Sequence, residues 1–356
     1  MQYRFTQTIL HSLEMNIFEE FTKKKLWGPY IIPLIELVQE KTKTNAKNTS
    51  LDEIKELLKE NHQQLFIDFF RSTKLNNTQK SIQEYLNKVN RQSGFYITEL
   101  MQLQEVSEQV IPVISYLTEF STVEIHNKLK DDFYQLHQHF IKIAFRIQAS
   151  TFLDCVPVLE NLLDKNSYLL IDIGTAPYSN PVFKPVWNAA ENLKKEKNCT
   201  TIVLNDNRPS NLYNKDLKDK SPIPEIDNGL RDYYLQIHCD GFGDYAGITS
   251  SLPTNGGRIS PAGIYYSKDN NCFISFVGRA AQLSEFSEYI APSIVESKYW
   301  NEFSVNHHKS CPGCQKIEKI TTPTDPYTGK SQAIWKGITM SHYIYTMNEY
   351  AKENSH

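Results

Sequence analysis

Short runs of aliphatic residues recur along the first 240 residues of the chain, and they restrict the possible folds more than any other feature. Each run has strand length and is apolar on both faces, as expected of a strand that is buried on two sides. Successive runs lie roughly 30 to 45 residues apart, which leaves room for the crossover that parallel strands require. The runs are Tyr30–Leu37, Leu65–Phe69, Val110–Ile114, Ile143–Ile147, Tyr168–Ile173, Thr201–Leu204 and Leu235–His238.

The segments between these runs have helical patterns. Ser50 to Glu53 form a capping box that opens a helix through Leu58, and Phe133–Ile141 carries apolar residues at helical spacing. Pro181–Glu196 begins with proline, as helices often do. With a first strand near Tyr3–Leu10, the count reaches about eight strand–helix units, which favours a closed (β/α)8 TIM-like barrel over residues 1–250. An open, doubly wound sheet is the alternative.

Two features modify this regular pattern. Pro33 and Pro112 fall inside expected strands, so we expect those strands to begin near the prolines. Asn76–Glu108 is longer than one crossover helix needs, which indicates an extra helix.

Residues 251–356 differ in character and predict a C-terminal cap. Gly263–Tyr266 and Cys272–Val277 predict a hairpin whose loop is Lys268–Asn271. A helix is expected around Ala281–Ile290, followed by an irregular tail that contains a Cys-x-x-Cys segment.

Composition excludes several classes of protein. The formal net charge of −3 provides no global basic field, so nucleic-acid binding is not indicated. Acidic residues interrupt the N-terminal segment where a signal peptide needs an apolar stretch, and no segment approaches the roughly 18 apolar residues of a membrane span. Of the six cysteines only Cys311 and Cys314 lie close together in sequence, which favours a reducing compartment. We therefore expect a cytoplasmic protein without membrane association.

The order of these segments resembles the beta-protein family carried by temperate phages and satellite elements. The resemblance spans roughly residues 30–345 and depends on the ordered set more than on any single motif. Its segments are IIPLIEL, LFIDFF, VIPVI, AFRI, LLIDIG, TIVLND, GFGDYAGI, FVGRA, CPGC, IWKG and SHYI.

The resemblance implies a barrel protein from an anti-phage defence locus, whose partners are other proteins of that locus. It implies no established chemistry. The sequence departs from the family near its start, because a lysine-rich first-strand motif with a following glutamate is absent and only Arg4 and Glu14 are found there. Any role of that lysine in relatives is therefore in doubt for this chain.

Polar residues follow the apolar runs where barrel enzymes place their active sites, at the carboxyl ends of the strands. Carboxylates around one mouth could hold a hard divalent cation such as Mg²⁺, and an arginine could bind a phosphate. That combination suits metal-assisted phosphoester hydrolysis, with Glu36 and Asp68 as metal ligands and Arg146 and Asp172 as catalytic residues. The alternative is an internal ion network in which the carboxylates pair with Arg146. The polar residues are Glu36, Asp68, Arg146, Asp172, Asp206, Asp240 and Asp244.

The segment from His238 to Tyr245 combines two glycines with acids and a tyrosine. A functional loop would use Asp244 as metal ligand or general base and Tyr245 as a substrate contact. The alternative is a tight turn into the last strand, where the glycines serve geometry alone. Arg279, after the second hairpin strand, could bind an anion over the barrel mouth or form a surface salt bridge.

A Cys-x-x-Cys pair with nearby histidines invites a zinc interpretation. Cys311 and Cys314 would supply two ligands and His308 a third, with His342 as a possible fourth. No second Cys-x-x-Cys exists, so a redox pair and plain structural thiols remain as alternatives.

Two functions from different classes follow. The first is a defence component that acts with partners as a sensor or regulator without catalysis, and the second is a metal-dependent phosphodiesterase or nuclease effector. Carboxylates that converge in an open pocket would favour the enzyme, whereas mutual pairing in a sealed interior would favour the regulator.

Overall fold

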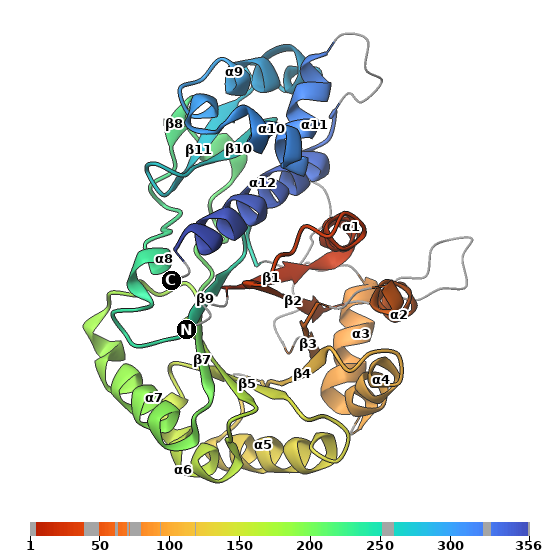
Figure 1. Cartoon of the computed structure of the whole chain (residues 1–356), viewed down its shortest axis with the longest axis vertical. Helices are drawn as coiled ribbons and strands as arrows, with labels where there is room; N and C mark the ends of the chain where they lie inside the picture. The colour runs from red at the N-terminus through yellow and green to blue at the C-terminus, as the bar shows by residue number, and fades with distance from the viewer. Residues whose placement is uncertain are drawn as a thin grey trace.

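The architecture is a curled parallel sheet surrounded by helices, with a second, smaller unit stacked beside it (Figure 1). It comes from a computed structural model of the chain. The residues that the structure describes are 5–38, 50–60, 63–69, 71, 80–92, 94–117, 119–250, 260–322 and 329–354.

All strands of the main sheet are parallel, and their pairing order is closed because the last strand pairs with both β7 and β1. The α/β class and the parallel sheet predicted from the aliphatic runs are thereby confirmed. The strands are β1 (Phe5–Leu10), β2 (Ile31–Leu37), β3 (Leu65–Phe69), β4 (Val110–Ile114), β5 (Ile143–Gln148), β6 (Ser167–Asp172), β7 (Thr200–Leu204) and β9 (Gly241–Asp244).

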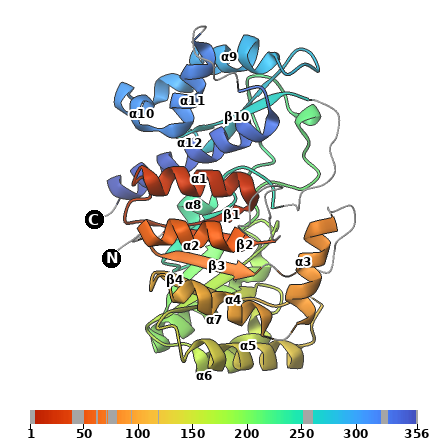
Figure 2. The ribbon, with the colours of Figure 1, turned by 90° about the vertical axis from the view of Figure 1, so that its right-hand side faces the viewer.

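Helices follow most strands and cover the outside of the sheet (Figure 2). The extra helix expected between β3 and β4 is present, because both α3 and α4 lie in that connection. The prolines lie inside their strands, since β2 and β4 each begin two residues before the proline. The helices are α1 (His11–Lys23), α2 (Ser50–Glu60), α3 (Lys80–Arg91), α4 (Phe95–Gln104), α5 (Thr122–Leu136), α6 (Phe152–Leu162), the short η1 (Pro181–Phe183) and α7 (Lys184–Lys197).

The last repeat departs from the regular pattern, and the strand predicted at Leu235–His238 is wrong. This segment is a turn after the four-residue helix α8 (Leu230–Tyr233), and His238 has a φ of 59°. A non-glycine residue with that φ cannot continue a strand. The strand that closes the order is β9, made from the segment that we expected to be a glycine-containing loop or turn.

The C-terminal unit is built on an antiparallel hairpin. Strands β10 (Ala262–Ser267) and β11 (Cys272–Val277) pair as predicted. The short strand β8 (Ser221–Pro222) adds to β11, so residues before position 250 also contribute to this sheet; the predicted division at residue 250 remains a prediction. The helix expected at Ala281–Ile290 begins later and is shorter, because only η3 (Phe286–Ile290) is helical within that range. The remaining elements are η2 (Asn214–Asp216), α9 (Ala291–Val295), η4 (Trp300–Glu302), α10 (Val305–Ser310), α11 (Pro312–Thr321) and α12 (Gln332–Glu353).

Helix α12 joins the two parts of the molecule. It runs beneath the hairpin and beside α1 in both ribbon views (Figures 1 and 2). Tyr343 on α12 donates a hydrogen bond to Asp244 of β9 at 2.7 Å, and Asn348 donates to the carbonyl of Leu26 at 3.1 Å. In the described part of the chain, no helix has the length and apolar character needed to cross a membrane.

Candidate functional site

The inside of the barrel has an apolar layer beneath a polar one. Because side chains alternate along a strand, every second residue of each barrel strand faces inward. The inward positions toward the carboxyl ends of β2, β3, β5 and β6 are Glu36, Asp68, Arg146 and Asp172. Below them lies a closed apolar cluster of Ile32, Leu34, Phe66, Ile111, Val113, Ala144, Tyr168, Leu170, Ile202 and Leu204.

Arg146 is the centre of the polar layer. Its guanidinium contacts one carboxylate from each of three other strands. The distance from Nη1 to Asp68 Oδ2 is 2.9 Å and that from Nη2 to Asp172 Oδ2 is 2.7 Å, and Nη1 also donates to Glu36. We call Glu36, Asp68, Arg146, Asp172 and Tyr245 the Arg146 cluster.

Hydroxyl groups complete the cluster. Tyr245 Oη donates to the Glu36 carboxylate, with distances of 3.0 and 3.2 Å to its two oxygens, and Ser115 Oγ donates to Asp68 Oδ1 at 2.6 Å. The backbone N–H of Gly174 donates to Asp172 Oδ1 at 2.9 Å. Each carboxylate is therefore engaged by a donor in addition to the arginine, which is what a buried charge requires.

Burial dominates the electrostatics of the cluster. Loss of solvation raises the pKa of Glu36 to about 7, the charge of Asp68 adds to the rise, and Arg146 opposes it. Desolvation acts to lower the pKa of Arg146, but the surrounding carboxylates, with Asp172 first, hold that pKa well above its usual value. The cluster is thus a balanced internal network around a permanently charged arginine.

Asp244 does not belong to this cluster, although we predicted it as a catalytic residue beside Tyr245. Adjacent strand residues face opposite sides, so Tyr245 reaches the interior while Asp244 faces outward. There it accepts from Tyr343 Oη and from the backbone N–H of Ala246, both at 2.7 Å. Burial raises the pKa of Asp244 to about 6, against the effect of these two hydrogen bonds.

The other candidates have their own hydrogen-bond, ion-pair or ring partners. Asp240 precedes β9 at its amino end, where it pairs with Lys194 at 2.7 Å, and Asp206 accepts from Ser250. Arg279, predicted to contact substrate over the mouth, instead places its guanidinium 3.8 Å from the ring centre of Tyr289 in the C-terminal unit. None of these three residues contacts Arg146.

A pocket of about 760 Å³ opens beside the cluster, at the carboxyl ends of β5 and β6. Asp172 lines it and is the one cluster carboxylate with appreciable exposure, at 18% of its side chain. Apolar residues Leu153 and Val182 form part of its lining and are exposed. The pocket can therefore accept a group with both polar and apolar character.

The predicted metal ligands Cys311 and Cys314 do come together with histidines, but not with His308. The ring of His308 stacks on Trp300, with centroids 4.0 Å apart. His307 takes its place, and one ligand atom from each of His307, Cys311, Cys314 and His342 lies within 4.8 Å of the others. We call these four residues the Cys–His cluster.

Sequence reasoning did not single out three side chains that contact the candidate residues, of which two had a signal. Ser115 follows Val113 by two residues and so continues the inward face of β4. His307 precedes Cys311 by four residues, about one helical turn, and His308 precedes it by three, so the spacing allowed either histidine to face Cys311. Nothing local to Tyr343 indicated that it would reach Asp244.

Among known proteins, the chain matches one protein family and has low similarity to a solved structure. No curated protein matches the sequence. Among solved structures, the tryptophan synthase subunit alpha from Campylobacter jejuni aligns at 10% identity over 68% of this chain and 87% of that one. The TM-score is 0.37, which supports no inference about this protein. The family model described as Beta protein matches residues 12–349, nearly the whole chain, and the protein therefore belongs to the beta-protein family.

Proposed function

We propose that this protein is a non-catalytic component of an anti-phage defence system, where it acts in the cytoplasm with partner proteins of its own locus as a sensor or regulator. The family membership supports the biological setting. We also propose that the fold is a variant TIM-like barrel with a C-terminal cap, in which α12 takes the place of a regular last helix.

The pairing within the Arg146 cluster is the observation that carries the non-catalytic assignment. Glu36 and Asp68 are almost fully buried, and their charges are directed at Arg146. A divalent cation at this position would have to displace the guanidinium from its three carboxylate partners. A metal-activated water also needs an open coordination position, and the sealed interior favours internal pairing over catalysis.

The pocket beside β5 and β6 supports the partner-binding part of the proposal. Leu153 and Val182 expose 49% and 65% of their surfaces while lining the same hollow. Exposed apolar side chains beside a hollow are typical of contact sites for other molecules. We therefore place the contact with a partner here.

The alternative function is a metal-dependent phosphodiesterase or nuclease effector. One observation favours it, namely that Asp172 reaches from the cluster into the pocket. An enzyme of this type would need the Asp172 carboxylate, whereas a regulator needs only its shape and hydrogen bonds.

Phage plating on cells that carry the gene with its neighbours tests the proposal. Deletion of the gene should abolish protection, and Asp172→Asn, at matched protein level and thermal stability, should retain it. Protection that survives the deletion would refute a role in defence. Loss of protection by Asp172→Asn would instead favour the effector, which purified protein with Mg²⁺ and a phosphodiester substrate would then test directly.

Co-purification tests the partner site separately. Leu153→Glu with Val182→Glu should reduce recovery of proteins encoded beside the gene. Ile141→Glu is the matched control, because Ile141 is also highly exposed but does not line the pocket. Equal recovery with both variants would place the contact elsewhere.

A further inference from the structure

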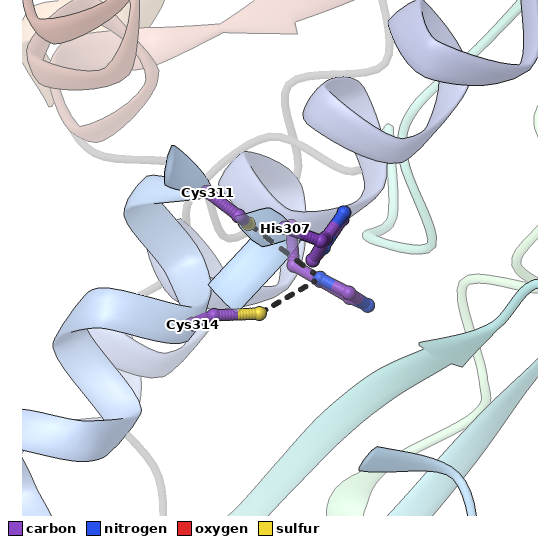
Figure 3. A group of neighbouring side chains, drawn as sticks. His307, Cys311 and Cys314 are labelled. Carbon is purple, nitrogen blue, oxygen red and sulfur yellow. Dashed lines mark hydrogen bonds between the residues drawn. The ribbon is translucent and has the colours of Figure 1, made fainter. Parts of the chain in front are cut away.

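The Cys–His cluster lies in the C-terminal unit, at the junction of α10, α11 and α12, and both of its cysteines belong to the hydrophobic core of that unit. His307 is on α10, Cys311 caps the start of α11, Cys314 is in its first turn, and His342 is near the middle of α12. Figure 3 shows the side chains of His307, Cys311 and Cys314 gathered around one point, with dashed lines for the two sulfur contacts to His342.

The distances fit a tetrahedral ion. The Nδ1 atom of His342 lies 3.6 Å from Cys311 Sγ and 3.5 Å from Cys314 Sγ. In a tetrahedron with Zn–S of about 2.3 Å and Zn–N of about 2.05 Å, the edge between sulfur and nitrogen is about 3.6 Å. Two edges of that tetrahedron are thus already present, and the four ligand atoms all lie within 4.8 Å of one another.

The outer ring nitrogens are held in the manner of metal-bound histidines. His342 Nε2 lies 3.1 Å from the backbone carbonyl of Tyr266, so it carries the proton and leaves Nδ1 free to coordinate. His307 Nδ1 lies 2.6 Å from the carboxylate of Glu349. A carboxylate or carbonyl behind each imidazole fixes the tautomer and increases its strength as a ligand.

His307 supplies a second, independent indication. Its side chain is 97% buried, and its Nε2 atom has no hydrogen-bond partner in the described part of the chain. A buried nitrogen of this kind normally has a partner, because leaving it unsatisfied costs free energy. A cation at the centre of the cluster would be that partner.

The backbone is shaped to keep the cluster closed. A Cβ atom on Gly313 would lie 2.7 Å from the carbonyl oxygen of Ile338 and 2.8 Å from Cβ of His342. Only glycine therefore lets the first turn of α11 approach α12 closely enough for both sulfurs to reach His342. The ring of Tyr265 stacks on His342 with centroids 4.0 Å apart and covers the cluster.

We propose that His307, Cys311, Cys314 and His342 bind one structural Zn²⁺ ion that fastens α10 and α11 to α12. Two thiolates and two neutral imidazoles fill all four tetrahedral positions, so no place remains for water or substrate, as in structural sites. The two thiolate charges balance the ion, which makes the buried group neutral overall. The thiol protons are released to solvent when the metal binds.

A disulfide between Cys311 and Cys314 would need an oxidant and would leave the His307 nitrogen without a partner. A catalytic redox pair needs access to its reaction partner, whereas both sulfurs have no exposed surface. The zinc assignment accounts for the sulfurs, the unpartnered nitrogen and the outer hydrogen bonds together.

Metal analysis of the full-length protein, purified without chelators, tests the proposal. We expect roughly one zinc per chain, and a Co²⁺-substituted protein should show the intense visible absorption of a tetrahedral site with thiolate ligands. An organomercurial that blocks thiols should release the zinc to a chromogenic chelator. Metal-free wild-type protein that also fails to bind Zn²⁺ or Co²⁺ after reduction would overturn the proposal.

The neighbouring histidines give a matched pair of variants. His307→Ala should lose zinc or bind Co²⁺ with an altered spectrum, whereas His308→Ala should keep both the stoichiometry and the spectrum. If His308→Ala lost the metal and His307→Ala kept it, the assignment of the ligands would be wrong. Since the wild-type metal analysis needs no variant, poor folding of His307→Ala would leave the test decisive.

Discussion

The two buried polar groups of this protein satisfy their charges in different ways. The Arg146 cluster contains its own cation, which pairs with carboxylates from three strands. The Cys–His cluster contains only groups that can donate lone pairs to an ion, and it leaves one buried nitrogen without a partner. A balanced network needs nothing from outside the chain, whereas the proposed zinc ion would supply the partner that the Cys–His cluster lacks.

The presence or absence of an internal cation distinguishes a structural ion network from a candidate metal site, even where both contain residue types that bind metals. Both groups contain residues that bind metals in other proteins, and acidic residues alone would have suggested the barrel as the metal site. The position of the cation decides between them. The following experiments test the contrast, in order of decreasing expected effect.

Removal of the internal cation should have the largest effect. Arg146→Met keeps much of the side-chain volume but leaves Glu36, Asp68 and Asp172 without their shared partner. We expect a loss of about 3 to 5 kcal/mol in the free energy of unfolding, measured by denaturant titration. Arg279→Met removes an exposed arginine and should change this free energy by no more than about 0.5 kcal/mol. Similar small effects for both would show that the cluster is not a stabilising network.

The protonation of Glu36 should make stability depend on pH. Its pKa is raised from 4.5 to about 7 in the folded protein. The folded state therefore binds more protons than the unfolded state between these values, and stability falls as the pH rises through this window. Relative to Glu36→Gln, the wild type should lose on the order of 3 kcal/mol between pH 4.5 and pH 8. A difference between the two proteins that stays constant with pH would contradict the raised pKa.

Separation of α11 from α12 tests the Cys–His cluster by geometry alone. Gly313→Ala places a Cβ against backbone atoms of α12 and should cost about 1 to 3 kcal/mol. It should also weaken zinc retention, since it moves both sulfurs away from His342.

Gly337→Ala on α12 is the control, because its Cβ would face α1 and meet only Ile17 Cδ1 at 3.9 Å. Removal of a helical glycine there should stabilise the protein by up to about 1 kcal/mol and leave zinc binding unchanged. Zinc loss in both variants, or in neither, would contradict the close-approach argument.

The contact between α12 and β9 should contribute least. Tyr343→Phe removes the hydroxyl that donates to Asp244 and leaves a buried carboxylate short of one donor. We expect the free energy of unfolding, measured by thermal or denaturant unfolding, to fall by about 1 to 2 kcal/mol. Tyr134→Phe, at an exposed position, should have almost no effect.

Much of the parallel sheet could be predicted because its strands are locally encoded. Runs such as Leu65–Phe69 are apolar on both faces, and the observed strand has the same bounds. The closing strand escaped prediction because Gly241 and Gly243 carry no apolar signal, while the nearby Leu235–His238 does. Leu235 and Ile237 alternate with polar residues, a pattern that a short turn can also have, and the positive φ at His238 shows that the segment does not continue as a strand.

The sequence by itself determined which residues could carry charge or coordinate a metal, and it placed Glu36 and Asp68 toward the carboxyl ends of their strands. The tertiary structure decided which of them meet. A one-residue difference sends Tyr245 inward and Asp244 outward, and a one-residue difference on α10 brings His307 to the cysteines while His308 stacks on Trp300. Partners such as Glu349 and Tyr343 come from α12, far along the chain, because contacts over such separations depend on packing rather than on local pattern.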